Sequence, residues 1–164
     1  MGTVFRGERG ICKFNEFTLF TNITIVSGFD NSSIEEITLP PSIKTGGGSA
    51  FQNSELKAIH INEGCEVILD RCLYGTKIQE DLVLPSTLLS FEGVGIYSGN
   101  TTYKYNMIVL AQIPPQAGTT AGWVWRNTLI NVYVPDESLS AYINANGWSD
   151  MASIILPISS LPRD

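Results

Sequence analysis

One short pattern of hydrophobic residues returns five times along the chain. It reads hydrophobic, two spacers, hydrophobic, one spacer, hydrophobic, with one extra spacer in the third copy. The copies end at positions 39, 61, 84, 110 and 134, so the steps are 22, 23, 26 and 24 residues. A fixed period of this length is typical of solenoids, because one coil cannot bury its hydrophobic face without stacked neighbours. The copies are Ile34-x-x-Ile37-x-Leu39, Leu56-x-x-Ile59-x-Ile61, Ile78-x-x-x-Leu82-x-Leu84, Tyr105-x-x-Ile108-x-Leu110 and Leu129-x-x-Val132-x-Val134.

Further positions recur at matched offsets after the first three copies. We expect them to stack into inward-facing ladders, one residue from each coil. Cys65 and Cys72 fall on such positions, which favours reduced, buried thiols. Pro40, Pro85 and Pro135 directly follow three of the copies and end a strand, because proline has no N–H to donate. The ladders are Ile43, Cys65 and Leu88; Gly46, Ile68 and Phe91; and Phe29, Phe51, Leu73 and Ile96.

Three segments carry a family resemblance: SSIEEITLPPSIKTGGGSAF, SELKAIHINEGCEVILDRCL and TKIQEDLVLPSTLLSFEGVGI. They resemble the repeat of the BspA-like leucine-rich repeat family, and the residues near 107–158 resemble its closing segment. The resemblance covers about 18–158. It departs at Gly46, where the repeat has Ile, and over the long step through 93–107. It implies a mainly β fold with few helices, a right-handed leucine-rich-repeat solenoid of four to five coils with a C-terminal helical cap.

The two ends of a solenoid need covers over their cores and strand edges. Phe14, Phe17 and Phe20 recur every three residues and predict a short helix or turn over the first coil, or alternatively an aromatic ligand platform. Asp136 is a candidate N-cap, and Gly147 a stop, for a helix over about 137–146. A second short turn is expected at 149–153. We therefore divide this single domain into an N-terminal cap (1–20), a solenoid (21–135) and a C-terminal cap (136–164).

The overall charge argues against one class of partner. The chain has 164 residues and a formal net charge of −6, which repels phosphate backbones and makes nucleic acid an unfavourable partner. No run of 18 apolar residues predicts membrane insertion. The first residues lack the apolar core of a signal peptide, so we expect either a mature fragment or export without such a signal.

Candidate catalytic groups are scattered. His60, the single histidine, alternates with Ile59 and Ile61 and should point outward from its strand. No G-x-S-x-G motif occurs. Adjacent acidic residues such as Glu35 and Glu36 face opposite sides of a strand, so they do not form a catalytic pair. Cys65, Cys72 and His60 are too few and too dispersed for a metal site. We expect no enzyme activity, no cofactor and no metal.

Strand alternation also predicts an outward surface. If the repeated hydrophobic residues face the core, one residue of each strand faces solvent in a row about 4.8 Å from the next. A flanking outward row runs through Glu36, Ala58, Asp81, Met107 and Asn131. Aromatic and methionine side chains are typical interface anchors. The candidate partner-binding residues are Thr38, His60, Val83, Met107, Val109 and Tyr133.

Two functions fit these observations. The resemblance implies a non-catalytic surface binding or adhesion module that recognises a protein or glycan, secreted or at the cell surface of a host-associated bacterium. The alternative is a structural or receptor-binding component of a phage particle or surface appendage that works by oligomeric assembly, which would place it on the virion surface. The ligand, the oligomeric state, the completeness of the chain and the choice between strand face and loops stay open, because fold does not specify them.

Overall fold

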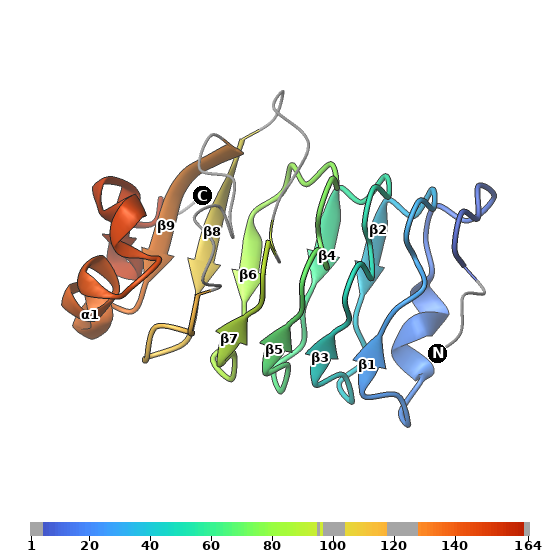
Figure 1. Cartoon of the computed structure of the whole chain (residues 1–164), viewed down its shortest axis with the longest axis horizontal. Helices are drawn as coiled ribbons and strands as arrows, with labels where there is room; N and C mark the ends of the chain where they lie inside the picture. Colours follow the sequence, from blue (N-terminus) through green and yellow to red (C-terminus); the bar gives the residue numbers. More distant parts are fainter. Residues whose placement is uncertain (1–4, 95, 97–103, 118–127, 163–164) are drawn as a thin grey trace.

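Parallel strands stacked along one axis make up most of the protein (Figure 1). The computed structural model describes residues 5–94, 96, 104–117 and 128–162. From β1 to β7 the short strands alternate between two sides of the stack, and β8 and β9 then both lie on the side of β2, β4 and β6 (Figure 1). The strands are β1 Ile25–Val26, β2 Glu36–Thr38, β3 Thr45–Gly46, β4 Ala58–His60, β5 Val67–Ile68, β6 Leu82–Leu84, β7 Ser90–Phe91, β8 Tyr105–Val109, β9 Leu129–Val134 and β10 Ile155–Pro157.

The strands form three parallel sheets. One side holds the sheet β1-β3-β5-β7. The other side is divided into the pair β2-β4 and a four-stranded sheet in the order β10-β9-β8-β6. Parallel strands need crossover connections, and here each crossover is the remainder of a coil. These features confirm a leucine-rich-repeat architecture of mainly strands and few helices, whereas the handedness, the number of coils and the segment boundaries stay predictions.

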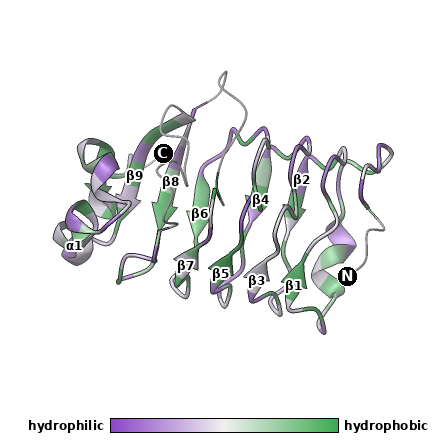
Figure 2. Cartoon of the chain, viewed as in Figure 1, coloured by the Kyte–Doolittle hydropathy of each residue, from purple (hydrophilic) through white to green (hydrophobic). Residues whose placement is uncertain are grey.

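The predicted ladders form part of the hydrophobic core. Hydrophobic residues concentrate on the strands and hydrophilic ones on the connecting turns (Figure 2). Phe29, Phe51, Leu73 and Ile96 are all at most 1% exposed, and the rings of Phe29 and Phe51 stack at 5.3 Å. Cys65 and Cys72 are buried, as expected, and burial raises the pKa of both thiols. The ladders are thus confirmed, because matched offsets align equivalent residues when coils stack.

The fourth copy of the pattern was assigned one residue out of register. Leu82 pairs with Met107, Val83 with Ile108 and Leu84 with Val109. The strand β8 has already begun at buried Tyr105, so alternation from that residue sends Met107 and Val109 inward. Both are fully buried, whereas Leu110 is 36% exposed. The predicted outward positions of Met107 and Val109 are therefore wrong, and so is the inward position of Leu110.

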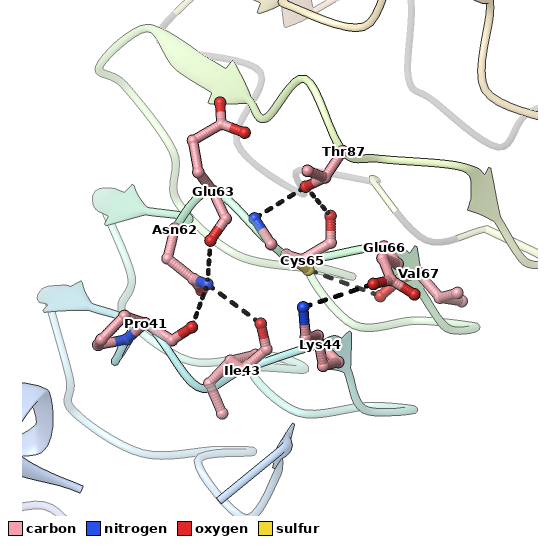
Figure 3. A network of polar contacts seen from close by, with 10 residues as sticks. Pro41, Ile43, Lys44, Asn62, Glu63, Cys65, Glu66, Val67 and Thr87 are labelled. Atoms are coloured by element: carbon pink, nitrogen blue, oxygen red, sulfur yellow. Dashed lines mark hydrogen bonds and ion pairs between the residues drawn. The ribbon is translucent and has the colours of Figure 1, made fainter. Parts of the chain in front are cut away.

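Asn62 occupies the position that proline takes after the other early strands. Its Nδ2 donates hydrogen bonds to the carbonyl oxygens of Pro41 (3.2 Å), Ile43 (3.1 Å) and Glu63 (2.8 Å) (Figure 3). The hydroxyl of Thr87, in the next coil, also forms hydrogen bonds to this turn. It accepts from the Gly64 N–H and donates to the Cys65 carbonyl, both at 2.8 Å (Figure 3). The polar substitute for proline thus joins neighbouring coils at this turn.

The N-terminal aromatic residues lie at the start of the stack. Asn15–Leu19 form the short 3-10 helix η1, which confirms the predicted short helix. Phe17 is fully buried and its ring lies 5.4 Å from that of Phe29 in the first coil. Phe20 is 43% exposed. The aromatic stripe therefore serves mainly as core packing.

The C-terminal residues form several short elements in place of one ten-residue helix. They are η3 Asp136–Ser138, α1 Leu139–Asn144, η4 Ser149–Ile154 and η5 Ile158–Ser160. The second turn near 149–153 is confirmed by η4. Asp136 is not the predicted N-cap, since its Oδ1 accepts the N–H of Ser159 at 3.0 Å. Gly147 has φ +81° but lies beyond the helix, which ends at Asn144.

The C-terminal elements contact the last coils through buried aromatic residues. The Tyr142 hydroxyl donates to the Ala111 carbonyl (2.7 Å), and the Trp148 indole N–H donates to the Pro115 carbonyl (2.8 Å). Both side chains are fully buried. Strand β10 then adds to β9 in parallel, with Leu156 opposite Tyr133. The capping role of the C-terminal elements stays a prediction.

Candidate functional site

We call the side of the solenoid that carries β2, β4, β6, β8 and β9 its outer side. The strand pairing on this side is interrupted between β4 and β6. Strands β2 and β4 pair in register, with Thr38 opposite His60, but β6 belongs to the next sheet. The third copy of the repeat carries one extra residue between Ile78 and Leu82. An inserted residue leaves a strand ladder locally unpaired. The extra spacer therefore accounts for the division of this side into two sheets.

A shallow depression of about 200 Å³ lies across this interruption. Its walls come from three successive coils, through β2, β4 and the approach to β6. The lining residues are Glu36, Ile37, Thr38, Ala58, Ile59, His60, Glu80, Asp81 and Val83.

Three of the six predicted site residues meet in this depression. Thr38 and His60 are exposed, and Val83 is 37% exposed. The other three do not contribute: Met107 and Val109 face the core, and Tyr133 is only 3% exposed. Tyr133 pairs in register with Ile108 on one side and Leu156 on the other, and it is buried although strand alternation predicts an outward position.

Sequence reasoning missed Glu80 as a site residue. Glu80 belongs to the lengthened third copy and lines the depression beside Asp81. The signal was present, because the extra spacer in that copy is the one irregularity of the pattern among the first three coils. An insertion that re-aims a strand is a common way of building a site on a sheet.

The negative charges around the depression are only partly neutralised. The Lys13 ammonium pairs with Glu36, and this hydrogen-bonded carboxylate raises the pKa of Lys13. Asp81 accepts hydrogen bonds from the backbone N–H (2.9 Å) and the side-chain amide (3.2 Å) of Asn106, a neutral partner. Glu80 is exposed and forms no ion pair with the residues that the structure describes, although it lies near enough to the Lys13 ammonium to raise the pKa of Lys13 slightly further. One ammonium thus faces three carboxylates, those of Glu36, Glu80 and Asp81. The depression therefore carries uncompensated negative charge.

Other kinds of site are not evident in the described residues. No group of three or more His, Cys, Asp or Glu side chains there could hold a metal ion. Nor does this part of the chain contain a helix long and apolar enough to cross a membrane. The depression combines three carboxylates, one imidazole, one hydroxyl and four aliphatic side chains, an arrangement suited to recognition of a complementary surface.

The stacked parallel coils and their outer depression define a repeat protein of the leucine-rich class. A BspA type leucine-rich repeat region matches residues 9–103 in six copies, and the chain belongs to this family. No curated protein matches the chain. The family indicates a repeat-based protein-binding or adhesion module. The resemblance of residues beyond 103 to the family's closing segment stays a prediction.

Proposed function

We propose that this protein is a non-catalytic binding or adhesion module that contacts its partner, a protein or a glycan, through the depression between β4 and β6. The observation that carries the proposal is the break in the outer sheets, which places Thr38, His60 and Val83 around one concavity. Solenoids present extended surfaces of this kind to their partners. A secreted or cell-surface location accords with the family and stays a prediction.

The depression can be blocked without touching the core. His60 is exposed and lines the depression, so His60→Trp should fill much of it while the inward ladders remain intact. Ala152→Trp is a matched control, because Ala152 is exposed on η4 and does not line the depression. Both variants should unfold in urea at the same concentration as the original protein.

The test is retention on printed arrays of extracellular-matrix proteins and of glycans. We expect the original protein and Ala152→Trp to bind the same spots, and His60→Trp to lose them. Absence of any retained spot, or retention unchanged by His60→Trp, would refute binding through the depression. The alternative of a phage or appendage component stays a prediction, and the mass in solution distinguishes it, since that function requires a stable oligomer.

A further inference from the structure

We infer that the depression receives an arginine side chain from a partner protein. This inference rests on the proposed function and specifies its ligand chemistry. Pockets for drug-sized ligands have volumes of about 300–1,000 Å³, whereas the present one has about 200 Å³. Its size therefore suits a single projecting side chain better than a whole small molecule.

Charge complementarity selects a cation. Glu80 lacks an ion-pair partner among the described residues, and Asp81 bonds only to the neutral Asn106. A cation that enters the depression gains attraction to these carboxylates that a neutral sugar does not. The nearby lysines neutralise only part of this charge, since Lys13 is hydrogen-bonded to Glu36 and interacts with Glu80 only at longer range, and Lys57 is held by Glu35 at 2.8 Å.

The apolar part of the lining favours arginine over lysine. Ile37, Ala58, Ile59 and Val83 form the hydrophobic part of the lining, together with the acidic Glu36 of β2 and the two acidic residues before β6. Arginine can lay its methylene groups on such a surface while its head reaches a carboxylate. The guanidinium is also planar and less strongly hydrated than an ammonium, and it can bond a carboxylate through two N–H groups. Both features match a shallow site with acidic walls.

The experiment uses a defined probe, the capped pentapeptide Gly-Gly-Arg-Gly-Gly. Its titration into ¹⁵N-labelled protein is followed through the amide resonances of residues 36–38, 58–60 and 80–83. We expect saturable shifts at these amides, weaker binding by the same peptide with citrulline, and loss of affinity at higher salt. Glu80→Gln should weaken arginine binding by about two- to fivefold, the range typical of exposed ion pairs.

Two controls make the result specific. Glu92→Gln removes one exposed carboxylate outside the lining and should leave the affinity unchanged. His60→Lys places a cation in the depression and should abolish the shifts. Equal binding of the citrulline peptide, equal effects of Glu80→Gln and Glu92→Gln, or the same shifts produced by Ca²⁺ alone would each overturn the inference.

The two proposals can fail separately. If the array spots vanish with His60→Trp but the arginine peptide produces no shifts, the depression binds a partner by other chemistry and only the arginine inference is wrong. If the peptide binds but no array spot depends on the depression, the arginine site exists and the proposed adhesion function is wrong.

Discussion

The Sγ atom of Cys72 lies 2.9 Å from the position that a β-carbon on Gly46 would occupy. The repeat of the family has isoleucine where this chain has Gly46, so the thiol of the following coil fills space that the missing side chain leaves. Cys72 is 3% exposed, and its thiol packs in the core instead of serving as a reactive group. The small residue at Gly46 and the buried thiol of Cys72 therefore compensate for each other in volume.

This relationship predicts a coupled pair of substitutions. Gly46→Ala should lower the free energy of unfolding by roughly 1–3 kcal/mol, the usual cost of overpacking. The neighbouring cavity has only about 10 Å³, about the minimum for one water, so it cannot take the displaced sulfur. Adding Cys72→Ala should recover part of the loss. Urea unfolding of both single variants and the double variant measures the coupling, and strictly additive losses would show that the two sites do not interact.

A second prediction tests the register of β8. Met107→Asp puts a carboxylate at a fully buried position. Its cost should be several kcal/mol, a large part of a typical stability of about 5–15 kcal/mol. Ile108→Asp is the matched control, since Ile108 aligns with the exposed Val83. Thermal unfolding followed by circular dichroism should show a large loss for Met107→Asp only. A larger loss of stability for Ile108→Asp than for Met107→Asp would support the register that the repeat pattern predicted.

The repeat pattern predicted the inward ladders of the first three coils because their strands are equally short and begin at equivalent positions. It failed at β8, where a five-residue strand starts at Tyr105 and alternation replaces the two-spacer step. Strand β10 was missed because three residues ending in Pro157 carry too little pattern to identify a strand. Asp136 was misassigned because the hydrogen-bond partner of its carboxylate, Ser159, lies 23 residues further along the same chain. Only tertiary contacts determine such choices.

The same reasoning applies to the candidate site. Thr38, His60 and Val83 were predicted from alternation alone, which holds wherever strands are regular. The depression arises from an irregularity, the residue inserted before Leu82, and its volume depends on how two sheets separate around that residue. Such a separation follows from packing between coils, so residue spacing indicates its place but not its shape.

The C-terminal elements should be required to keep the protein soluble and to prevent association through its last coil. Removing residues 136–164 deletes β10, Tyr142 and Trp148, and uncovers the edge of β9. An open, apolar strand edge promotes association. We expect the truncated chain to form large species in analytical ultracentrifugation. A monomeric truncated chain at high concentration would contradict the capping role.

A point substitution separates packing from edge protection. Trp148→Ala in the complete chain should lower the free energy of unfolding by about 3–5 kcal/mol, as for other buried aromatic residues, and leave β10 in place. Its folded fraction should therefore associate no more than the original protein, although it is less stable. Association as strong as that of the truncated chain would assign the protective role to the tryptophan instead of the strand.

Acid should weaken the attachment of the C-terminal residues through Asp136. The Ser159 hydroxyl and, secondly, its backbone N–H bond this carboxylate and lower the pKa of Asp136. A folded-state pKa below the unfolded value, about 3.9 for aspartate, stabilises the protein above that value. This contribution is lost as the pH falls through the lower, folded-state pKa. Asp136→Asn should therefore lower the urea midpoint at pH 7 but have a smaller effect near pH 3. The neighbouring Glu137→Gln, which removes the same charge without this bond, should have little effect at either pH. A deficit of Asp136→Asn that is equal at both pH values would show that the ionised carboxylate does not hold Ser159.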